Sequence, residues 1–243
     1  MRILALETST EYCSVALWQD GVVSARCELV GQKHSEVLMA MLDGLLKEAG
    51  VTVTQLDGIA FGKGPGSFTG VRIACGVAQG LALGANLSVV GVCTLEALAQ
   101  ASQHDRVVAA LDARMGEIYL AAYERLDAGW NTLCEPCLCK AEDAPGLVGE
   151  GWFGVGSGFA ADTPASQQHA AAGSGALTRH FGKQLSGVDA RAIPQASAIS
   201  QLAAIQFRRG NALDAALALP LYLRNKVALT TREREAVRAN PVG

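Results

Sequence analysis

Apolar and polar positions follow two different periods in the first hundred residues, and each period predicts one type of element. Three short apolar runs separated by polar turns predict antiparallel strands, at residues 2–6, 13–18 and 22–29. Asp20-Gly21 between the last two is a hairpin signal. Residues 35–49 then place apolar side chains three and four apart, which predicts an amphipathic helix ended by Gly50.

Strands and helices alternate after this opening. The pattern predicts a strand at 56–61, a glycine loop at 62–66, a helix at 68–84, a strand at 87–92 and a helix at 95–101. The order is therefore βββαβαβα. Because hairpin-linked strands are antiparallel and strands joined through helices are parallel, we expect an α/β fold with a mixed sheet.

The opening pattern returns later in the chain. Residues 106–112 repeat the pattern of residues 2–7, and a second strand at 118–123 follows as before. We therefore predict a duplicated unit. The expected parts are an N-terminal lobe at 1–103, a C-terminal lobe at 104–219, and a segment at 220–243 that returns to the first lobe and ends in a frayed, charged tail.

Amino-acid composition argues against a disordered chain and against a nucleic-acid-binding protein. Of the 243 residues, 50% are hydrophobic and 18% are charged, which excludes disorder and indicates a surface that a partner covers. A net charge of −3 and 5% aromatic residues give no global hold on phosphate backbones and few stacking platforms. We expect any contact with RNA to be local and subordinate to partners.

The chain carries features of a cytoplasmic protein. Its seven cysteines are an odd number without framework spacing, which is typical of reduced thiols. The opening apolar run is interrupted by Glu7, so we predict no signal peptide. The longest apolar tract, residues 71–95, includes Arg72, Gln79 and Asn86 and is interpreted as helix, turn and strand, so no membrane association is expected.

Small residues mark the outer faces of two predicted helices. Arg72, Gly76, Gly80 and Gly84 recur every four residues and share one face of the second helix. Each interior glycine costs roughly 1 kcal/mol relative to alanine, so close approach of another backbone is the natural compensation. The outer face of the first helix carries Ala40, Asp43, Gly44 and Lys47. Two interpretations stay open: a surface for a partner's helices, or packing of these two helices on each other.

A glycine loop joins the strand at 56–61 to the second helix. Free backbone N–H groups at a helix start can hold an anion, so a remnant phosphate loop would combine the first turn with this loop, using Glu7, Thr8, Ser9, Gly64, Gly66 and Ser67. The alternative, which we favour, is a tight turn in which Ser67 caps the helix. A second cluster, Gly154 to Gly158, is interpreted as a strand-end turn.

The usual catalytic patterns are incomplete. Glu7 ends the first strand, but the strand at 56–61 ends without an acid, so the paired carboxylates of a two-metal nuclease are missing. The His-Glu-x-x-His spacing of zinc proteases is absent. Cys134, Cys137 and Cys139 lie in a predicted loop or edge strand without a second ligand pair and are interpreted as idle thiols. We therefore predict no catalytic residue.

Three strings together resemble one family. They are Ile3-Leu-Ala-Leu-Glu-Thr-Ser-Thr-Glu-Tyr-Cys-Ser-Val-Ala-Leu17, Gly64-Pro-Gly-Ser-Phe-Thr-Gly-Val-Arg72 and Ala110-Leu-Asp-Ala-Arg-Met-Gly-Glu117. With Pro220-Leu-Tyr-Leu-Arg224, they are similar to the bacterial TsaB family, also called YeaZ. The resemblance implies an actin-like ASKHA fold of two ribonuclease-H-like lobes. It also implies an accessory subunit for threonylcarbamoylation of adenosine 37 in tRNAs that read codons starting with A.

The resemblance also implies a subunit without its own chemistry. The catalytic paralogue TsaD carries a metal-binding His-x-x-x-His where this chain has Thr94 and Leu98, and neither side chain replaces an imidazole ligand. We expect no cofactor or metal on this chain, with ATP and a metal ion used by the partner complex. Expected partners are TsaD and, through the complex, the ATPase TsaE, with tRNA contacted only indirectly. A metal-dependent peptidase-like hydrolase and an ASKHA small-molecule kinase are the alternatives.

In this family the contact with TsaD is a packing of the first two helices of each partner. Those helices match residues 35–49 and 68–84, so the resemblance favours the partner-surface interpretation of their small residues. The same surface allows a homodimer when TsaD is absent, and the sequence does not rank the two assemblies.

Overall fold

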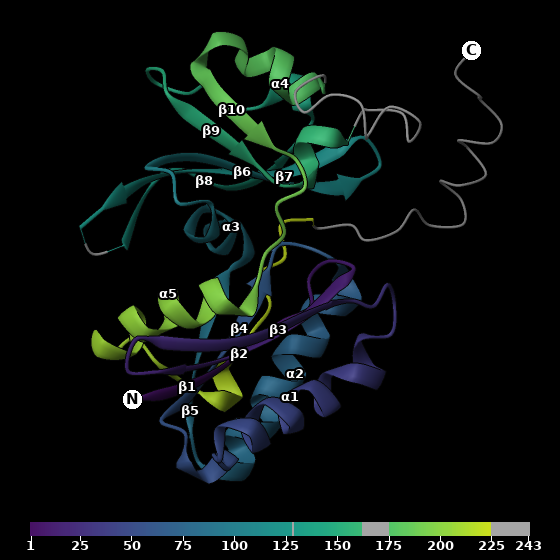
Figure 1. The fold of residues 1–243 in the computed structure, drawn as a ribbon. Coiled ribbons are helices and arrows are strands. Elements are labelled where there is room, and N and C mark those ends of the chain that lie inside the picture. Colours follow the sequence, from purple (N-terminus) through teal and green to yellow (C-terminus); the bar gives the residue numbers. More distant parts are fainter. Residues whose placement is uncertain (128, 162–174, 225–243) are drawn as a thin grey trace, which may run out of the picture.

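The computed structural model describes residues 1–127, 129–161 and 175–224, which form two lobes, each built on one mixed sheet (Figure 1). In the first lobe the strand order is β11-β5-β4-β1-β2-β3. The strands are β1 (Arg2–Glu7), β2 (Tyr12–Gln19), β3 (Val22–Leu29), β4 (Gly58–Gly64), β5 (Ser88–Cys93) and β11 (Leu213–Asp214). β1, β2 and β3 are antiparallel, whereas β4 and β5 run parallel to β1, as the βββαβαβα order predicts.

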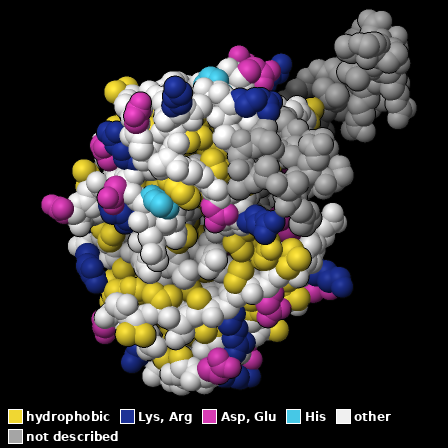
Figure 2. All heavy atoms as spheres, turned by 45° about the horizontal axis from the view of Figure 1, so that its top comes forward, with side chains coloured by type: hydrophobic (Ala, Val, Ile, Leu, Met, Phe, Trp, Pro, Cys, Tyr) yellow, Lys and Arg dark blue, Asp and Glu magenta, His cyan; other side chains and the backbone are white. Residues whose placement is uncertain are grey.

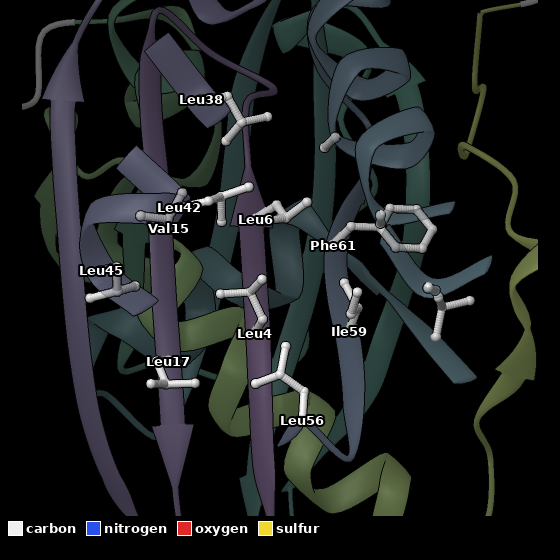
Figure 3. Close-up of a cluster of buried hydrophobic side chains, with 14 of the residues drawn as sticks. Leu4, Leu6, Val15, Leu17, Leu38, Leu42, Leu45, Leu56, Ile59 and Phe61 are labelled. Atoms are coloured by element: carbon white, nitrogen blue, oxygen red, sulfur yellow. The ribbon is translucent and has the colours of Figure 1, made fainter. Parts of the chain in front are cut away.

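Helices cover both faces of the first sheet. On one face, α1 (His34–Ala49) and α2 (Phe68–Ala85) pack against side chains such as Leu4 and Leu6 (Figure 3). On the other face, α5 (Ala196–Arg208) and α3 (Thr94–Ser102) pack against the alternate positions of the same strand. Because both faces are buried, β1 is apolar at consecutive positions rather than at every second one. The predicted elements of this lobe are confirmed to within a few residues.

The second sheet repeats the first. Its order is β10-β9-β6-β7-β8, with β6 (Arg106–Arg114), β7 (Glu117–Leu126), β8 (Gly129–Cys139), β9 (Trp152–Val155) and β10 (Leu185–Asp189). This order corresponds to β5-β4-β1-β2-β3, with the same parallel and antiparallel pairs, so the predicted duplication is confirmed. The sequence did not predict β10 or the short α4 (Ala176–Phe181), which lack a strong period of their own.

The chain returns to the first lobe earlier than expected. α5 packs on the first sheet, and β11 pairs with β5 at its edge. The predicted boundary at residue 219 is therefore too late, and the second lobe ends near Asp189. The reason is that α5 carries a stripe of Ala, Ile and Leu that fits the face opposite α1 and α2. The predicted frayed tail at 225–243 lies outside the described residues.

Candidate functional site

The outer face of α2 is open. Gly76, Gly80 and Gly84 are exposed, and a Cβ atom built at any of them would meet no atom within 4 Å. No backbone of this chain among the described residues approaches these glycines. Packing within the chain therefore does not explain them, and the interpretation that they let α1 and α2 pack closely on each other is wrong.

The remainder of α2 shows how much apolar surface is left uncovered. By length and composition alone the helix could cross a membrane, yet only 33% of it is buried within the protein. Its buried side, which includes Val71, Ala74 and Ala78, lies in the core of the first lobe. On the exposed side Leu83 is 61% accessible, and Met39 on α1 is 50% accessible. We call Gly76, Gly80 and Gly84 the glycine stripe. Exposed large side chains beside such an uncovered stripe are typical of an interaction surface.

The outer face of α1 is only partly open. Ala40, Asp43 and Lys47 are exposed, and the Lys47 Nζ forms an ion pair with the Asp43 carboxylate at 2.6 Å. Gly44, in contrast, is covered by the guanidinium of Arg26 from β3, which occupies the space of a Cβ at this position. The absence of a side chain at Gly44 is therefore explained within the chain.

Arg72, at the N-terminal end of the glycine stripe, is held by two aromatic side chains. Its Nε donates a hydrogen bond to the hydroxyl oxygen of Tyr222 at 2.7 Å. Its guanidinium carbon lies 3.5 Å from the ring centre of Phe68 and 5.4 Å from that of Tyr222. Sequence reasoning missed Tyr222 as a site residue. The available signal was the string Pro220-Leu-Tyr-Leu-Arg224, which carried the resemblance without an assigned role.

The glycine loop is hydrogen-bonded to the turn that follows β1, which contains Thr8 and Ser9. The Ser67 backbone N–H donates to the Ser9 carbonyl oxygen at 2.7 Å, and the Gly70 N–H donates to the Ser67 hydroxyl at 3.3 Å. The Thr8 hydroxyl donates to the Gly70 carbonyl at 2.7 Å. Ser67 is thus the N-cap of α2, as the favoured interpretation predicts.

Glycines are needed where the first turn presses on this loop. A Cβ at Gly66 would lie 2.6 Å from the Ser9 Cβ, and one at Gly70 would overlap the Thr8 carbonyl oxygen. Gly64, with a φ of +101°, turns the chain beneath Leu221. Two of the N–H groups that could hold a phosphate, those of Ser67 and Gly70, are already bonded within the chain.

Glu7 is enclosed rather than presented to a substrate. It is 1% exposed, its Oε1 accepts the Ser9 N–H at 2.5 Å, and its Oε2 has no hydrogen-bond partner among the described residues. Burial raises the pKa of this carboxyl above its ordinary value of 4.5. This shift favours the protonated form of the carboxyl relative to that of an exposed glutamate.

Comparison with known proteins identifies the family. A sequence model described as TsaD, tRNA N6-adenosine threonylcarbamoyltransferase, matches residues 18–230. The tRNA threonylcarbamoyladenosine biosynthesis protein TsaB of Escherichia coli is 41% identical over 237 residues, covering 94% of this chain and 96% of the relative. The chain belongs to the TsaB family. The TsaB of Haemophilus influenzae is 38% identical over 240 residues, covering 93% of this chain and 95% of the relative.

A solved structure agrees with this assignment. YeaZ from Pseudomonas aeruginosa superposes with a TM-score of 0.81 at 36% identity, covering 91% of this chain and 99% of that one. The two lobes described above are therefore the actin-like ASKHA fold, as the resemblance of the sequence strings implies.

Thr94 and Leu98 of this TsaB-family chain lie on the first turns of α3. Both are fully buried, and the Thr94 hydroxyl has no hydrogen-bond partner in the part of the chain that the structure describes. Within residues 1–127, 129–161 and 175–224, no group of three His, Cys, Asp or Glu side chains is arranged to hold a metal ion. The donor set at this position, one hydroxyl and one aliphatic side chain, does not fit a transition metal.

A wide groove of about 1250 Å³ separates the lobes of the TsaB-family chain. The first lobe lines the groove with the turn after β1 and the start of α2. The second lobe lines it with the β6–β7 turn and residues 190–193, and Leu221 to Arg224 complete the lining. On the molecular face in Figure 2, charged side chains of both signs are interspersed. That distribution is unlike the basic stripe of a nucleic-acid-binding surface.

The three clustered cysteines lie on β8, the edge strand of the second sheet. Burial and the neighbouring Cys137 thiol raise the pKa of Cys134 to about 11 and that of Cys139 to about 12. These two thiols are protonated at neutral pH, which makes them weak nucleophiles and weak metal ligands. The edge-strand alternative for this segment is confirmed.

Proposed function

We propose that this TsaB-family chain is a non-catalytic subunit that binds the catalytic paralogue TsaD and activates it for threonylcarbamoylation of adenosine 37 in tRNAs reading codons that start with A. The observation that carries the proposal is the open glycine stripe of α2, beside the exposed side chains of α1. The related proteins of Escherichia coli and Haemophilus influenzae are named as tRNA threonylcarbamoyladenosine biosynthesis proteins.

The energetics of α2 support a helix as the partner's contacting element. Glycines at three positions cost roughly 1 kcal/mol each in helix stability, and no contact within the described chain compensates for them. A row without side chains lets a second helix approach with its backbone close to α2, which increases dispersion contact. Ala40 on α1 also has a small side chain, and the ion-paired Asp43 and Lys47 lie on the same face of this helix.

Activation follows from preferential binding. A subunit without its own chemistry changes the rate only by binding the active conformation of TsaD more tightly than the inactive one. In this proposal ATP and a metal ion belong to the partner complex, the ATPase TsaE joins through that complex, and tRNA is held mainly by the partners. The location is the cytoplasm.

Three observations favour a non-enzyme over the two alternatives. Thr94 and Leu98 supply no ligands for a metal-dependent hydrolase. Glu7 is buried with a raised pKa. The N–H groups of Ser67 and Gly70, at the start of α2, are bonded within the chain, which disfavours a small-molecule kinase.

The test is co-purification with TsaD, followed by size-exclusion chromatography with light scattering. Gly80→Leu places a branched side chain in the open stripe and should abolish the heterodimer while leaving the circular dichroism spectrum unchanged. Gly146→Leu is the matched control, because a Cβ at Gly146 also meets nothing within 4 Å and its loop lies in the second lobe. Ala40→Arg, on α1, tests the same face independently.

Two results would contradict the proposal. One is a Gly80→Leu or Ala40→Arg chain that retains wild-type affinity for TsaD. The other is a stoichiometric metal content in the isolated wild-type chain, measured by mass spectrometry of each chromatographic peak, which would favour the hydrolase. The isolated chain run in parallel shows whether a homodimer uses the same face, because Gly80→Leu should then convert it to a monomer.

A further inference from the structure

Arg72 is an unpaired cation on the proposed partner face. Lys47 and Arg72 are the Lys and Arg residues of α1 and α2. Lys47 is already paired with Asp43, whereas Arg72 has no carboxylate within ion-pair distance in the part of the chain that the structure describes. The two cations are therefore not equivalent, and only Arg72 retains its charge for another molecule.

The Arg72 side chain is held in one orientation before any partner arrives. Its Nε is bonded to the Tyr222 hydroxyl at 2.7 Å, and the guanidinium lies 3.5 Å from the ring centre of Phe68. The two aromatic rings are 5.8 Å apart and remain 36% and 45% exposed. This arrangement leaves the terminal Nη groups without a hydrogen bond to the described residues, and their edge presents two parallel donors.

The position of Tyr222 is set from both lobes. The Leu221 N–H donates to the Lys63 carbonyl of β4 at 2.6 Å. Three residues later, the Arg224 Nη2 pairs with Glu117 at 2.7 Å and donates to the Ala113 carbonyl at 3.0 Å in the second lobe. The segment from Leu221 to Arg224 is thus fixed on either side of the tyrosine, which keeps its hydroxyl in place against Arg72.

We propose that Phe68, Arg72 and Tyr222 form a preformed receptor for one carboxylate side chain of the TsaD surface that contacts α2, with Tyr222 as the positioning residue. The inference rests on the proposed function and assigns a chemical feature to the partner. A carboxylate matches two parallel guanidinium donors. A guanidinium that is already oriented loses less side-chain entropy on binding, and Arg and Tyr are enriched among residues that dominate interface affinity.

A carboxylate is favoured over an RNA phosphate by the surroundings. Phosphate backbones are bound by several cations acting together. Arg114, Arg191 and Arg224 line the groove between the lobes, but on α2 itself Arg72 is the only Lys or Arg and is followed by glycines and apolar residues. A single charge-assisted contact at the end of an apolar face is the usual composition of a protein interface with a polar rim.

The experiment measures the dissociation constant of the full chain with TsaD by calorimetry at 50 and 300 mM NaCl. Arg72→Gln should weaken binding at low salt by roughly 30-fold and reduce its salt dependence, within the range for hot-spot residues. Tyr222→Phe removes only the hydroxyl and should weaken binding by about 3- to 10-fold through the freed Arg72. Arg72→Lys keeps the charge but not the fork and should restore little. Lys140→Gln is the control, because Lys140 is an exposed lysine of the second lobe away from α1 and α2, and it should change affinity less than about twofold.

The outcomes separate the receptor from the proposed function. If Arg72→Gln binds TsaD as tightly as wild type while Gly80→Leu does not, the receptor is wrong and the partner face stands. If neither variant changes the affinity, the proposed function itself fails. If Arg72→Gln leaves the affinity for TsaD unchanged but lowers retention of tRNA by the complex, the ligand is a phosphate and the carboxylate receptor is overturned. Wild-type affinity in Tyr222→Phe, together with a loss of affinity in Tyr222→Ala, would reduce Tyr222 to a structural residue.

Discussion

Replacing Gly76 and Gly80 by alanine should make the isolated chain more stable and its complex with TsaD weaker. A glycine in a helix interior costs about 1 kcal/mol relative to alanine, and a Cβ at either position meets nothing within 4 Å. No clash offsets the gain, so the double variant should gain about 2 kcal/mol in the free energy of unfolding. For a chain of this size, that corresponds to a rise in Tm of roughly 4–8 °C.

Urea unfolding and calorimetry of the isolated chain measure the first effect, and titration with TsaD measures the second. The added methyl groups should hold the two helices apart and weaken binding by about 10-fold, since overpacking typically costs 1–3 kcal/mol. Gly70→Ala is the matched control within the same helix. Its Cβ would overlap the Thr8 carbonyl oxygen, so this variant should be destabilised instead.

Stability and affinity for TsaD should therefore change in opposite directions. A lower free energy of unfolding in Gly76→Ala or Gly80→Ala would mean that these positions are packed within the chain. A stabilised double variant that binds TsaD with wild-type affinity would mean that close helix approach does not maintain the glycines.

Three further predictions concern groups away from this face. Glu7→Gln should stabilise the chain relative to wild type at pH 7 but not at pH 4. A carboxyl whose pKa is raised on folding lowers the free energy of unfolding as the pH rises above its unfolded value of 4.5. Urea titrations of both chains at the two pH values measure this effect, and an equal difference at both would contradict it. Cys134 and Cys139, with pKa values of about 11 and 12, should react with iodoacetamide at pH 8 at least about 100-fold more slowly than in the urea-unfolded chain, as followed by mass spectrometry, and equal rates would contradict their burial. Gly44→Ala should change the free energy of unfolding by about 0.5 kcal/mol or less, because the atom in its way is the end of the flexible Arg26 side chain, and a loss above about 2 kcal/mol in urea unfolding would show that Arg26 cannot move.

Local periodicity accounts for what could be predicted of the fold. Residues 35–49 and 68–84 carry strong helical periods, and the structure places α1 and α2 within one or two residues of them. The repeat of residues 2–7 at 106–112 correctly predicted a duplicated unit, and the structure adds that its sheet has the same strand order as the first. Short elements such as β10 lack enough residues to show a period, and the return of α5 to the first sheet depends on which apolar faces remain uncovered.

The candidate site was likewise predictable only in part from local sequence spacing. The spacing of Gly76, Gly80 and Gly84 determined that they share one face, because four residues are close to one helical turn. Whether that face is covered or open was decided by the packing of α2 on the sheet. Gly44, which seemed equivalent in the sequence, is covered by Arg26 from a neighbouring strand.

By itself, the sequence determined the order of strands and helices, the duplication, the capping role of Ser67 and the family strings, since each depends on residues close together in the chain. Only the tertiary structure decided that Ser9 closes the glycine loop and that Tyr222 holds Arg72 across 150 positions. The physical reason is that a hydrogen bond depends on distance in space, and residues this far apart become neighbours only when the lobes and the segment between them have packed.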